Sequence, residues 1–180
     1  MAWTTPRDWV GGELVTEAIM DTHVKGNFDA TWHLIVRKTS SESVNSGGTG
    51  TTLQNDDQLL MALATNEVWL LQWVIIHSGG ATGAPNLKVA FTLPASATMD
   101  FAVVYANSGG TFAEQRWQTS GTSKDLLSPA SANPGVLNIM GRVSCAGTAG
   151  NIQLQWAQNS SSAENETVYL NSCLFGLKLA

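Results

Sequence analysis

The chain has 180 residues, enough for one domain with a hydrophobic core and a short appendage. Hydrophobic residues make up 43 % and charged residues only 13 %, which indicates a folded protein whose surface carries mainly neutral polar groups. The net charge of −5 opposes nucleic-acid binding, and no apolar run is long enough to cross a bilayer. The first residues also lack the pattern of a secretory signal, so we expect folding in a cytoplasm.

Residues 1–15 are expected to form an extended arm, because Pro6 and the glycines at 11–12 oppose a helix. Trp3 and Trp9 lie in this arm, which is too short and irregular to bury two indole rings by itself. We therefore expect the arm to dock into a groove on another chain. The arm residues assigned to this contact are Trp3, Pro6, Arg7 and Trp9.

A short helix is predicted from Glu17 to Asn27, with Thr16 as its N-cap. Apolar residues that include Ile19 and Val24 recur on one side at helical spacing. Because so short a helix is marginal alone in water, Ile19 and Val24 are expected to join the docking contact.

The hydrophobic period changes to that of strands at residue 34, so residues 1–33 are assigned to a docking arm and residues 34–180 to one β-domain. Residues 68–76 are apolar on both alternating phases, which is typical of a central strand or of a strand in a subunit interface. The phase assigned to a subunit interface consists of Trp69, Leu71, Trp73 and Ile75.

Two polar segments of this domain are interpreted as turns or ends. Arg37 and Lys38 are expected at the solvated end of a strand. Asn55, Asp56 and Asp57 predict a turn, which is favoured over half of a calcium or acid–base site because no third carboxylate is near in the sequence.

Further strands are predicted at residues 87–93, 101–105, 112–117, 136–146, 152–156 and 167–179. The phase expected to face the core in the last strand is Cys173, Phe175, Leu177 and Leu179. Cys145 and Cys173 are interpreted as buried thiols in preference to a disulfide. Strands separated by turn-rich loops, with one short helix confined to an extended N-terminal arm, predict a mainly β protein. The expected architecture is an antiparallel β-sandwich of the jelly-roll type.

The sequence contains no signature of a catalytic, cofactor or metal site. Its three histidines match no zinc spacing, and Gly-x-Ser-x-Gly and phosphate-binding glycine motifs are absent. We therefore expect no enzyme activity, no cofactor and no metal. The seven tryptophans raise carbohydrate binding as an alternative, with Trp117 beside a polar loop as the candidate for stacking on a sugar.

The opening Trp3-Thr-Thr-Pro-Arg-Asp-Trp-Val-Gly-Gly-Glu-Leu-Val-Thr16, followed by Met20-Asp-Thr-His-Val-Lys-Gly-Asn27, resembles that of many virion structural proteins of tailed bacteriophages. Their pattern runs Trp-x-x-Pro-Arg-x-Trp, then Gly-Glu-x-Val-Thr, then Met-Asn-x-His-x-Arg-x-Asn. Asp21 and Lys25 replace the Asn and Arg of that pattern. Similar segments downstream are residues 51–56, 66–69 and 154–159.

This resemblance implies a virion component with a jelly-roll or tumour-necrosis-factor-like body that forms a homotrimer. Such proteins serve as capsid decoration (cement) proteins, head fibres, or tail and baseplate components. The small body favours decoration of the capsid, with the arm bridging capsomers, the major capsid protein as partner and assembly in the host bacterial cytoplasm. The alternative is a tail-fibre, head-fibre or baseplate protein that binds host-surface glycans through Trp117 and the loops 78–86 and 119–134. A polysaccharide-degrading enzyme is the third and least favoured interpretation.

Overall fold

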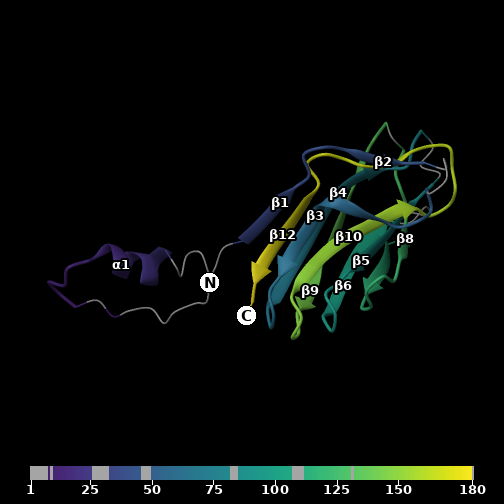
Figure 1. The fold of residues 1–180 in the computed structure, drawn as a ribbon. Coiled ribbons are helices and arrows are strands. Elements are labelled where there is room, and N and C mark those ends of the chain that lie inside the picture. Colours follow the sequence, from purple (N-terminus) through teal and green to yellow (C-terminus); the bar gives the residue numbers. More distant parts are fainter. Residues whose placement is uncertain are drawn as a thin grey trace.

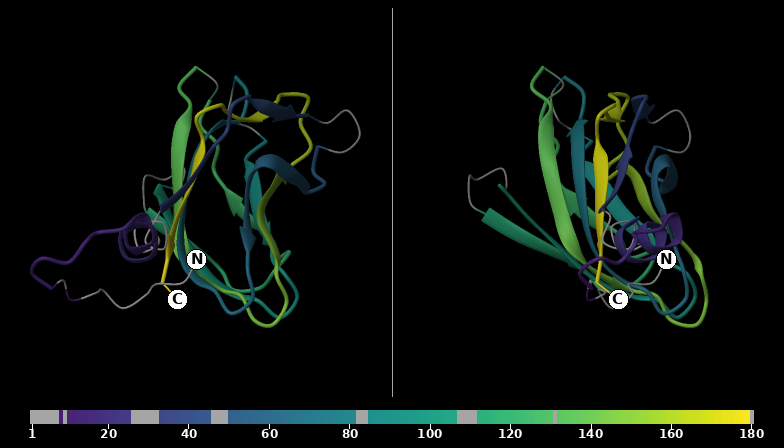
Figure 2. Two further views of the ribbon diagram at one scale, coloured as in Figure 1. Left: turned by 60° about the vertical axis from the view of Figure 1, so that its left-hand side comes forward. Right: turned by 90° about the vertical axis from the view of Figure 1, so that its left-hand side faces the viewer.

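The computed structural model describes residues 8, 10–25, 33–45, 50–81, 85–106, 112–130 and 132–179. Among these residues, twelve strands form two antiparallel sheets that lie face to face, and one short helical segment precedes them (Figures 1 and 2). The prediction of a mainly β sandwich is confirmed.

The larger sheet consists of β1 (His33–Arg37), β2 (Glu42–Val44), β4 (Val68–Ser78), β6 (Thr98–Ala106), β7 (Phe112–Trp117), β9 (Gly135–Ser144), β11 (Glu166–Val168) and β12 (Cys173–Lys178). The smaller sheet consists of β3 (Gln54–Leu63), β5 (Leu87–Thr92), β8 (Lys124–Leu126) and β10 (Gly150–Gln158).

The strand order is β1-β12-β4-β9-β6-β7 in the larger sheet, where β11 pairs with both β2 and β4, and β3-β10-β5-β8 in the smaller sheet. From β3 to β6, and again from β8 to β10, successive strands alternate between the two sheets. Apart from β6 and β7, paired strands are therefore not consecutive in the sequence, as in a jelly roll.

The core lies between the two sheets and is built from one alternating phase of each strand. In β5, β9 and β10 one alternating set of side chains faces the other sheet. Those that are buried are Leu87, Val89, Phe91, Leu137, Ile139, Val143, Ile152, Leu154 and Trp156.

Aromatic rings fill the middle of this core. The ring centroid of Trp73 lies 4.7 Å from that of Phe91 and 4.9 Å from that of Phe101. Phe91 in turn meets Trp117 edge to face at 5.5 Å. Tilted and edge-to-face pairs of this kind contribute about 0.5–1.5 kcal/mol each beyond the area they bury. They join strands of both sheets and fix how one sheet packs on the other.

The helical segment begins where the sequence predicts it. Thr16 caps α1 (Glu17–Met20) by accepting a hydrogen bond from the Ile19 backbone N–H at 3.3 Å, and a π-helical turn (Asp21–Lys25) follows. The predicted stop at Gly26 and Asn27 lies outside the described residues. Within the described ranges, neither helical segment is long and apolar enough to span a membrane.

The turn predicted at Asn55, Asp56 and Asp57 is wrong, because all three residues lie inside β3. The pairing of β3 with β10 is irregular at this point, and its register shifts between Gln153 and Gln155. The Asp56 carboxylate accepts hydrogen bonds from two backbone N–H groups of β3, at 3.0 and 2.8 Å. Such a local bond lets a residue typical of turns stabilise a bulge within a strand.

Lys38 is also placed differently from its prediction, because it is fully buried and not a solvated strand end. Its Nζ lies 2.8 Å from Oδ2 of Asp56, which is fully buried too, and 2.9 Å from Oε2 of the half-buried Glu42. This ion pair joins the connection between β1 and β2 to β3. Neighbouring Arg37 is exposed, as expected.

The last strand faces the core with the phase opposite to the predicted one. In β12, Leu174 and Gly176 point inward opposite Trp73 and Leu71 of β4. The residues predicted to be inward in β12 lie on the outer side and are only half-buried: Cys173, Phe175 and Leu177. Both thiols are free, with Cys145 buried as expected and Cys173 partly exposed.

Candidate functional site

The described part of the arm exposes apolar side chains. Leu14 and Val10 keep 79 % and 70 % of their surface in solvent, Val15 and Met20 about half or less, and no residue of α1 is buried. Of the predicted docking residues, Val24 is exposed and Ile19 is half-buried. The other four, Trp3, Pro6, Arg7 and Trp9, lie outside the described residues.

The predicted subunit interface on β4 is wrong for three of its four residues. Leu71, Trp73 and Ile75 have no exposed surface in a single chain, so a neighbouring molecule cannot contact them. Trp69 is half-buried, and its indole N–H donates to Oε2 of Glu67 at 3.0 Å. The side chains of β4 that point outward belong to the other alternating set, which is also mainly apolar.

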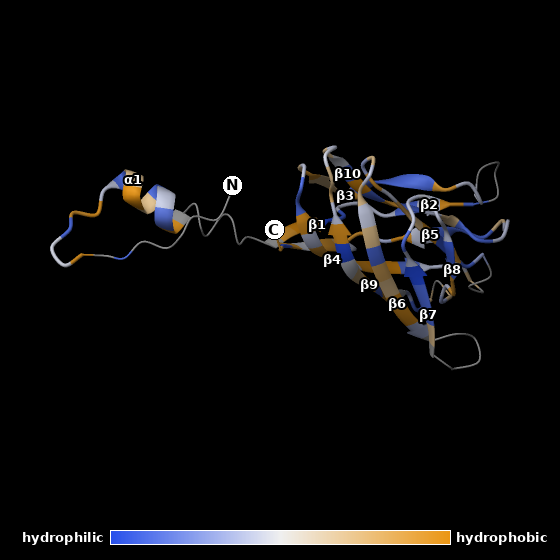
Figure 3. Cartoon of the chain, turned by 90° about the horizontal axis from the view of Figure 1, so that it is seen from below, coloured by the Kyte–Doolittle hydropathy of each residue, from blue (hydrophilic) through white to orange (hydrophobic). Residues whose placement is uncertain are grey.

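That outward phase belongs to a broad hydrophobic surface, which we call the apolar sheet face. It covers the outer side of β1, β12, β4, β9 and β6, where cross-strand partners share a side. Hydrophobic residues recur along the ribbons of β1, β4, β9 and β6 in Figure 3. Its apolar members are Ile35, Leu70, Val74, Ile76, Val104, Val136, Met140, Phe175 and Leu177. Ile35, Val136 and Val104 keep 61 %, 62 % and 65 % of their surface exposed.

The outer side of the smaller sheet has a different character. Its polar members are Lys88, Thr92, Asp125, Asn151, Gln153 and Gln155, and its apolar ones are Leu60 and the small residues Ala62, Ala90 and Ala157. A sheet face that meets only water normally carries polar residues. The outer side of the smaller sheet is closer to this norm, and the outer side of the larger sheet departs from it.

Charged side chains gather at the β6–β7 end of the apolar sheet face. Arg116 Nε donates to Oδ1 of Asp100 at 2.6 Å, and Arg142 lies opposite Asp100 on β9. The hydrogen bond from Arg116 lowers the pKa of the Asp100 carboxyl, so this exposed pair stays ionised at neutral pH.

A cluster of polar groups is buried beside the β4–β11 pairing. Ser128 Oγ lies 2.8 Å from both carboxylate oxygens of Glu166, and His77 Nδ1 lies 3.2 Å from Glu166 Oε1 and 3.3 Å from Ser128 Oγ. A serine–histidine–acid relay needs the hydroxyl and the carboxylate on opposite ring nitrogens. Here both approach Nδ1, so the cluster is not arranged for nucleophilic catalysis.

The Glu166 carboxyl gives the fold a predictable pH dependence. Burial raises its pKa, against the hydrogen bonds from His77 and Ser128 that lower it. Because the folded pKa exceeds the unfolded value of about 4.3, the contribution of Glu166 to stability is largest below that value. It is lost as the pH rises through the folded pKa.

We expect Glu166→Gln to remove this loss. As the pH rises from about 4 to about 8, the free energy of unfolding of the wild type should fall relative to that of the variant. Urea unfolding at several pH values measures the difference. Glu114→Gln, at an exposed position of β7, is the control and should track the wild type. Parallel curves for wild type and Glu166→Gln would contradict the assignment.

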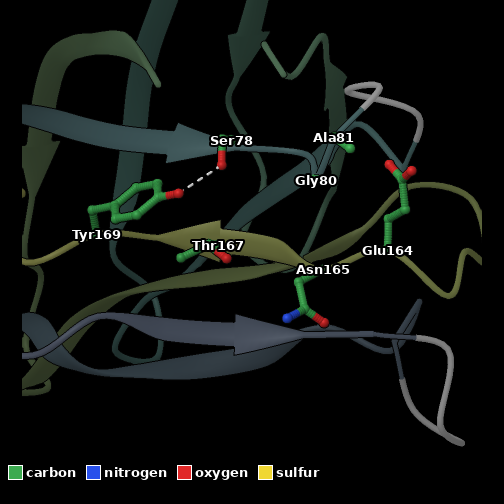
Figure 4. A pocket seen from close by; sticks show the side chains of 7 residues that line it. All are labelled: Ser78, Gly80, Ala81, Glu164, Asn165, Thr167 and Tyr169. Atoms are coloured by element: carbon green, nitrogen blue, oxygen red, sulfur yellow. Dashed lines mark hydrogen bonds between the residues drawn. The ribbon is translucent and has the colours of Figure 1, made fainter. Parts of the chain in front are cut away.

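A polar depression of about 260 Å³ lies at the loop end of the sandwich (Figure 4). Ser78 and Tyr169 point toward each other, and their hydroxyl oxygens lie 2.9 Å apart. Gly80, with a left-handed φ of 77°, lies against the side chain of Glu164, where a Cβ would come within 2.6 Å. The remaining lining residues are Ala81, Asn165 and Thr167.

The tryptophan proposed for sugar stacking is not available. Trp117 is fully buried, and its indole N–H donates to the Val89 carbonyl at 3.1 Å. The loops proposed with it do contribute to depressions. Ser78, Gly80 and Ala81 line the polar one, and residues 127–129 line another of about 420 Å³ next to His77. Nowhere in the described ranges do His, Cys, Asp and Glu gather in groups of 3 or more that could hold a metal ion.

No family model and no curated relative matches the chain. One similar solved structure contains the carbohydrate-binding (CBM22-1) and GH10 modules of xylanase 10B from Clostridium thermocellum, complexed with xylohexaose. It shows 10 % identity over 85 % of this chain and 27 % of that one, with a TM-score of 0.31. The VP2 subviral particle of infectious bursal disease virus shows 11 % identity over 83 % of this chain and 40 % of that one, with a TM-score of 0.20. The chain thus spans less than half of either protein. Similarities this low carry no information about function.

Proposed function

We propose that this chain is a structural protein of a tailed-bacteriophage virion, and specifically a capsid decoration protein whose arm bridges capsomers. The observation that supports it best is the described part of the arm, where Leu14, Val10 and Val24 are exposed although the body has a complete core of its own. The resemblance of residues 3–27 to the opening of phage virion proteins agrees with this role.

In the proposed mechanism the arm becomes ordered when it binds. Ordering costs about 1–2 kcal/mol per residue in backbone entropy, and burial returns about 25 cal/mol per Å² of apolar surface. Large side chains such as Trp3, Trp9 and Leu14 therefore have to be buried for the arm to bind at all. The proposed partner is the major capsid protein, and the body is proposed to form a homotrimer. Assembly in the host cytoplasm requires neither a cofactor nor catalysis.

Binding to expanded, undecorated capsids tests this function. The wild type should bind such capsids and raise their unfolding temperature in calorimetry. Trp9→Ala should weaken binding by at least about 30-fold, as expected for an anchor residue that contributes about 2 kcal/mol. Asp8→Ala, which changes the exposed neighbouring residue, is the matched control. A wild type that neither binds nor stabilises the capsids would refute the decoration role.

The second candidate function is a tail-fibre, head-fibre or baseplate protein that binds host-surface glycans. The depression beside Tyr169 favours it, since hydroxyl, amide and carboxylate groups line it together with an aromatic side chain. A glycan array with the wild type and Thr167→Ala tests this function. Glycan binding that the variant loses, together with no capsid binding, would replace the decoration role by this one.

A further inference from the structure

The geometry points to the apolar sheet face as the contact between copies of this chain. The inference deepens the proposed function, on which it rests for the expectation of a homotrimer, by placing the interface on the outward phase of β4. The interface expected from the sequence consists of the opposite set of β4 side chains.

The contrast between the two outer surfaces is the first reason. One unbroken cross-strand row of the apolar sheet face runs through Ile35, Phe175, Gln72, Met140 and Ala102. The single polar residue of this row, Gln72, donates a hydrogen bond to Oδ1 of Asn138 at 3.0 Å. The amide pair therefore satisfies itself and brings no charge to the centre of the face, whereas the smaller sheet presents glutamines and charges to water.

The size of the face is the second reason. The five strands have 5, 6, 11, 10 and 9 residues, and at about 3.4 Å per residue and about 4.8 Å between strands they give a surface of roughly 700 Å². Stable protein–protein contacts of standard size bury about 600–1,000 Å² on each partner, and the area of this face lies within that range. The arm of the same chain fits it less well, because a helix is only about 10 Å across and α1 has a single turn.

The distribution of charge selects the partner. A strongly charged face would favour a partner of opposite sign, but this face has a neutral centre. It carries Asp100, Arg116 and Arg142 toward one border and Arg37 at the other, so both signs are present. In a contact between identical copies, two-fold or three-fold, one chain's surface must supply both members of every complementary pair. The face meets that requirement, and a second copy is the occupant we infer.

Sedimentation of the full chain tests the interface. The wild type should sediment as an oligomer, and Met140→Glu or Ile35→Glu should reduce its mass to the 19.1 kDa of one chain. Ala62→Glu places the same charge on the exposed outer side of the smaller sheet and should leave the oligomer intact. Near-ultraviolet circular dichroism of the buried aromatic rings checks that each variant is folded.

The thiol of Cys173 gives a second readout that needs no substitution. It lies on the apolar sheet face opposite Val74, whereas Cys145 is 2 % exposed. Reaction of Cys173 with a thiol reagent should slow by at least about 10-fold when dilute wild-type protein is concentrated into oligomers, because the thiol must be accessible to react.

Three outcomes would overturn the inference: a monomeric wild type, an oligomer that both glutamate variants retain, or a thiol whose rate does not depend on concentration. Its failure can be told apart from failure of the decoration role. A monomer that still binds capsids refutes the interface alone, and an oligomer mapped to this face that ignores capsids refutes decoration alone.

Discussion

Asp56→Ala is expected to lower the free energy of unfolding by about 3–5 kcal/mol, since removal of one partner strands the other charge in the interior. Lys38 and Asp56 are both fully buried, with 2.8 Å between their charged atoms. The substitution also removes the acceptor for the backbone N–H groups of Gln58 and Leu59. The half-buried Glu42 compensates Lys38 only in part.

Asp57→Ala is the matched control, because the adjacent carboxylate is exposed. It should change stability by less than about 0.5 kcal/mol. Urea unfolding at neutral pH measures both variants. The double variant Lys38→Met with Asp56→Ala should recover part of the loss, because it removes the uncompensated charge. Equal effects at positions 56 and 57 would show that the buried pair does not stabilise the fold.

Gly141→Ala is expected to destabilise the protein by at least about 3 kcal/mol, at the upper end of what overpacking costs. A Cβ at this position would lie 2.6 Å from the Cα of Phe101 and would also press on the Asp100 carbonyl oxygen. Both obstacles are backbone atoms of β6, which cannot swing aside as a side chain can. β6 would have to separate from β9 along the register that joins them at Gly141 and Phe101.

Gly147→Ala tests whether the loss comes from this contact or from glycine replacement in general. A Cβ at Gly147 meets nothing within 4 Å, and the residue is exposed. Its substitution should stay within about 1 kcal/mol of the wild type and can even stabilise the chain by restricting its unfolded state. Thermal unfolding followed by circular dichroism compares the two. A Gly141 variant as stable as the Gly147 variant would mean that β6 and β9 can separate at little cost.

The sequence predicts which side of a strand is buried where one phase is apolar and the other polar, as in β10. It mistakes the buried side of β4 and β12. In β10, Ile152 and Leu154 alternate with glutamines, so burial of the apolar set decides the orientation. β4 and β12 carry apolar residues on both phases, and local periodicity cannot tell which phase meets the smaller sheet. The wrong assignments of Trp73 and Cys173 share this cause. The fold class survives them because it depends on the spacing of strands and turns.

The polar interior could not be predicted from local patterns. Lys38 and Asp56 are 18 positions apart, and Glu166 reaches His77 across 89 positions. Each of these residues has the sequence context of a surface group. Only the assembled sheets bring the partners together, and a single sequence carries no signal for such a pairing.

The buried aromatic rings have a consequence for optical measurements. Trp73, Trp117 and Trp156 have no exposed surface, so a dissolved quencher such as acrylamide cannot reach them in the native state. Blue-shifted emission that resists quenching should therefore come from the sandwich. Any fraction that acrylamide removes must come from the other four indoles of the chain, of which the half-buried Trp69 lies in β4. With Trp69→Phe as the background, intrinsic fluorescence thus offers a label-free way to follow the remaining indoles when the protein meets a partner.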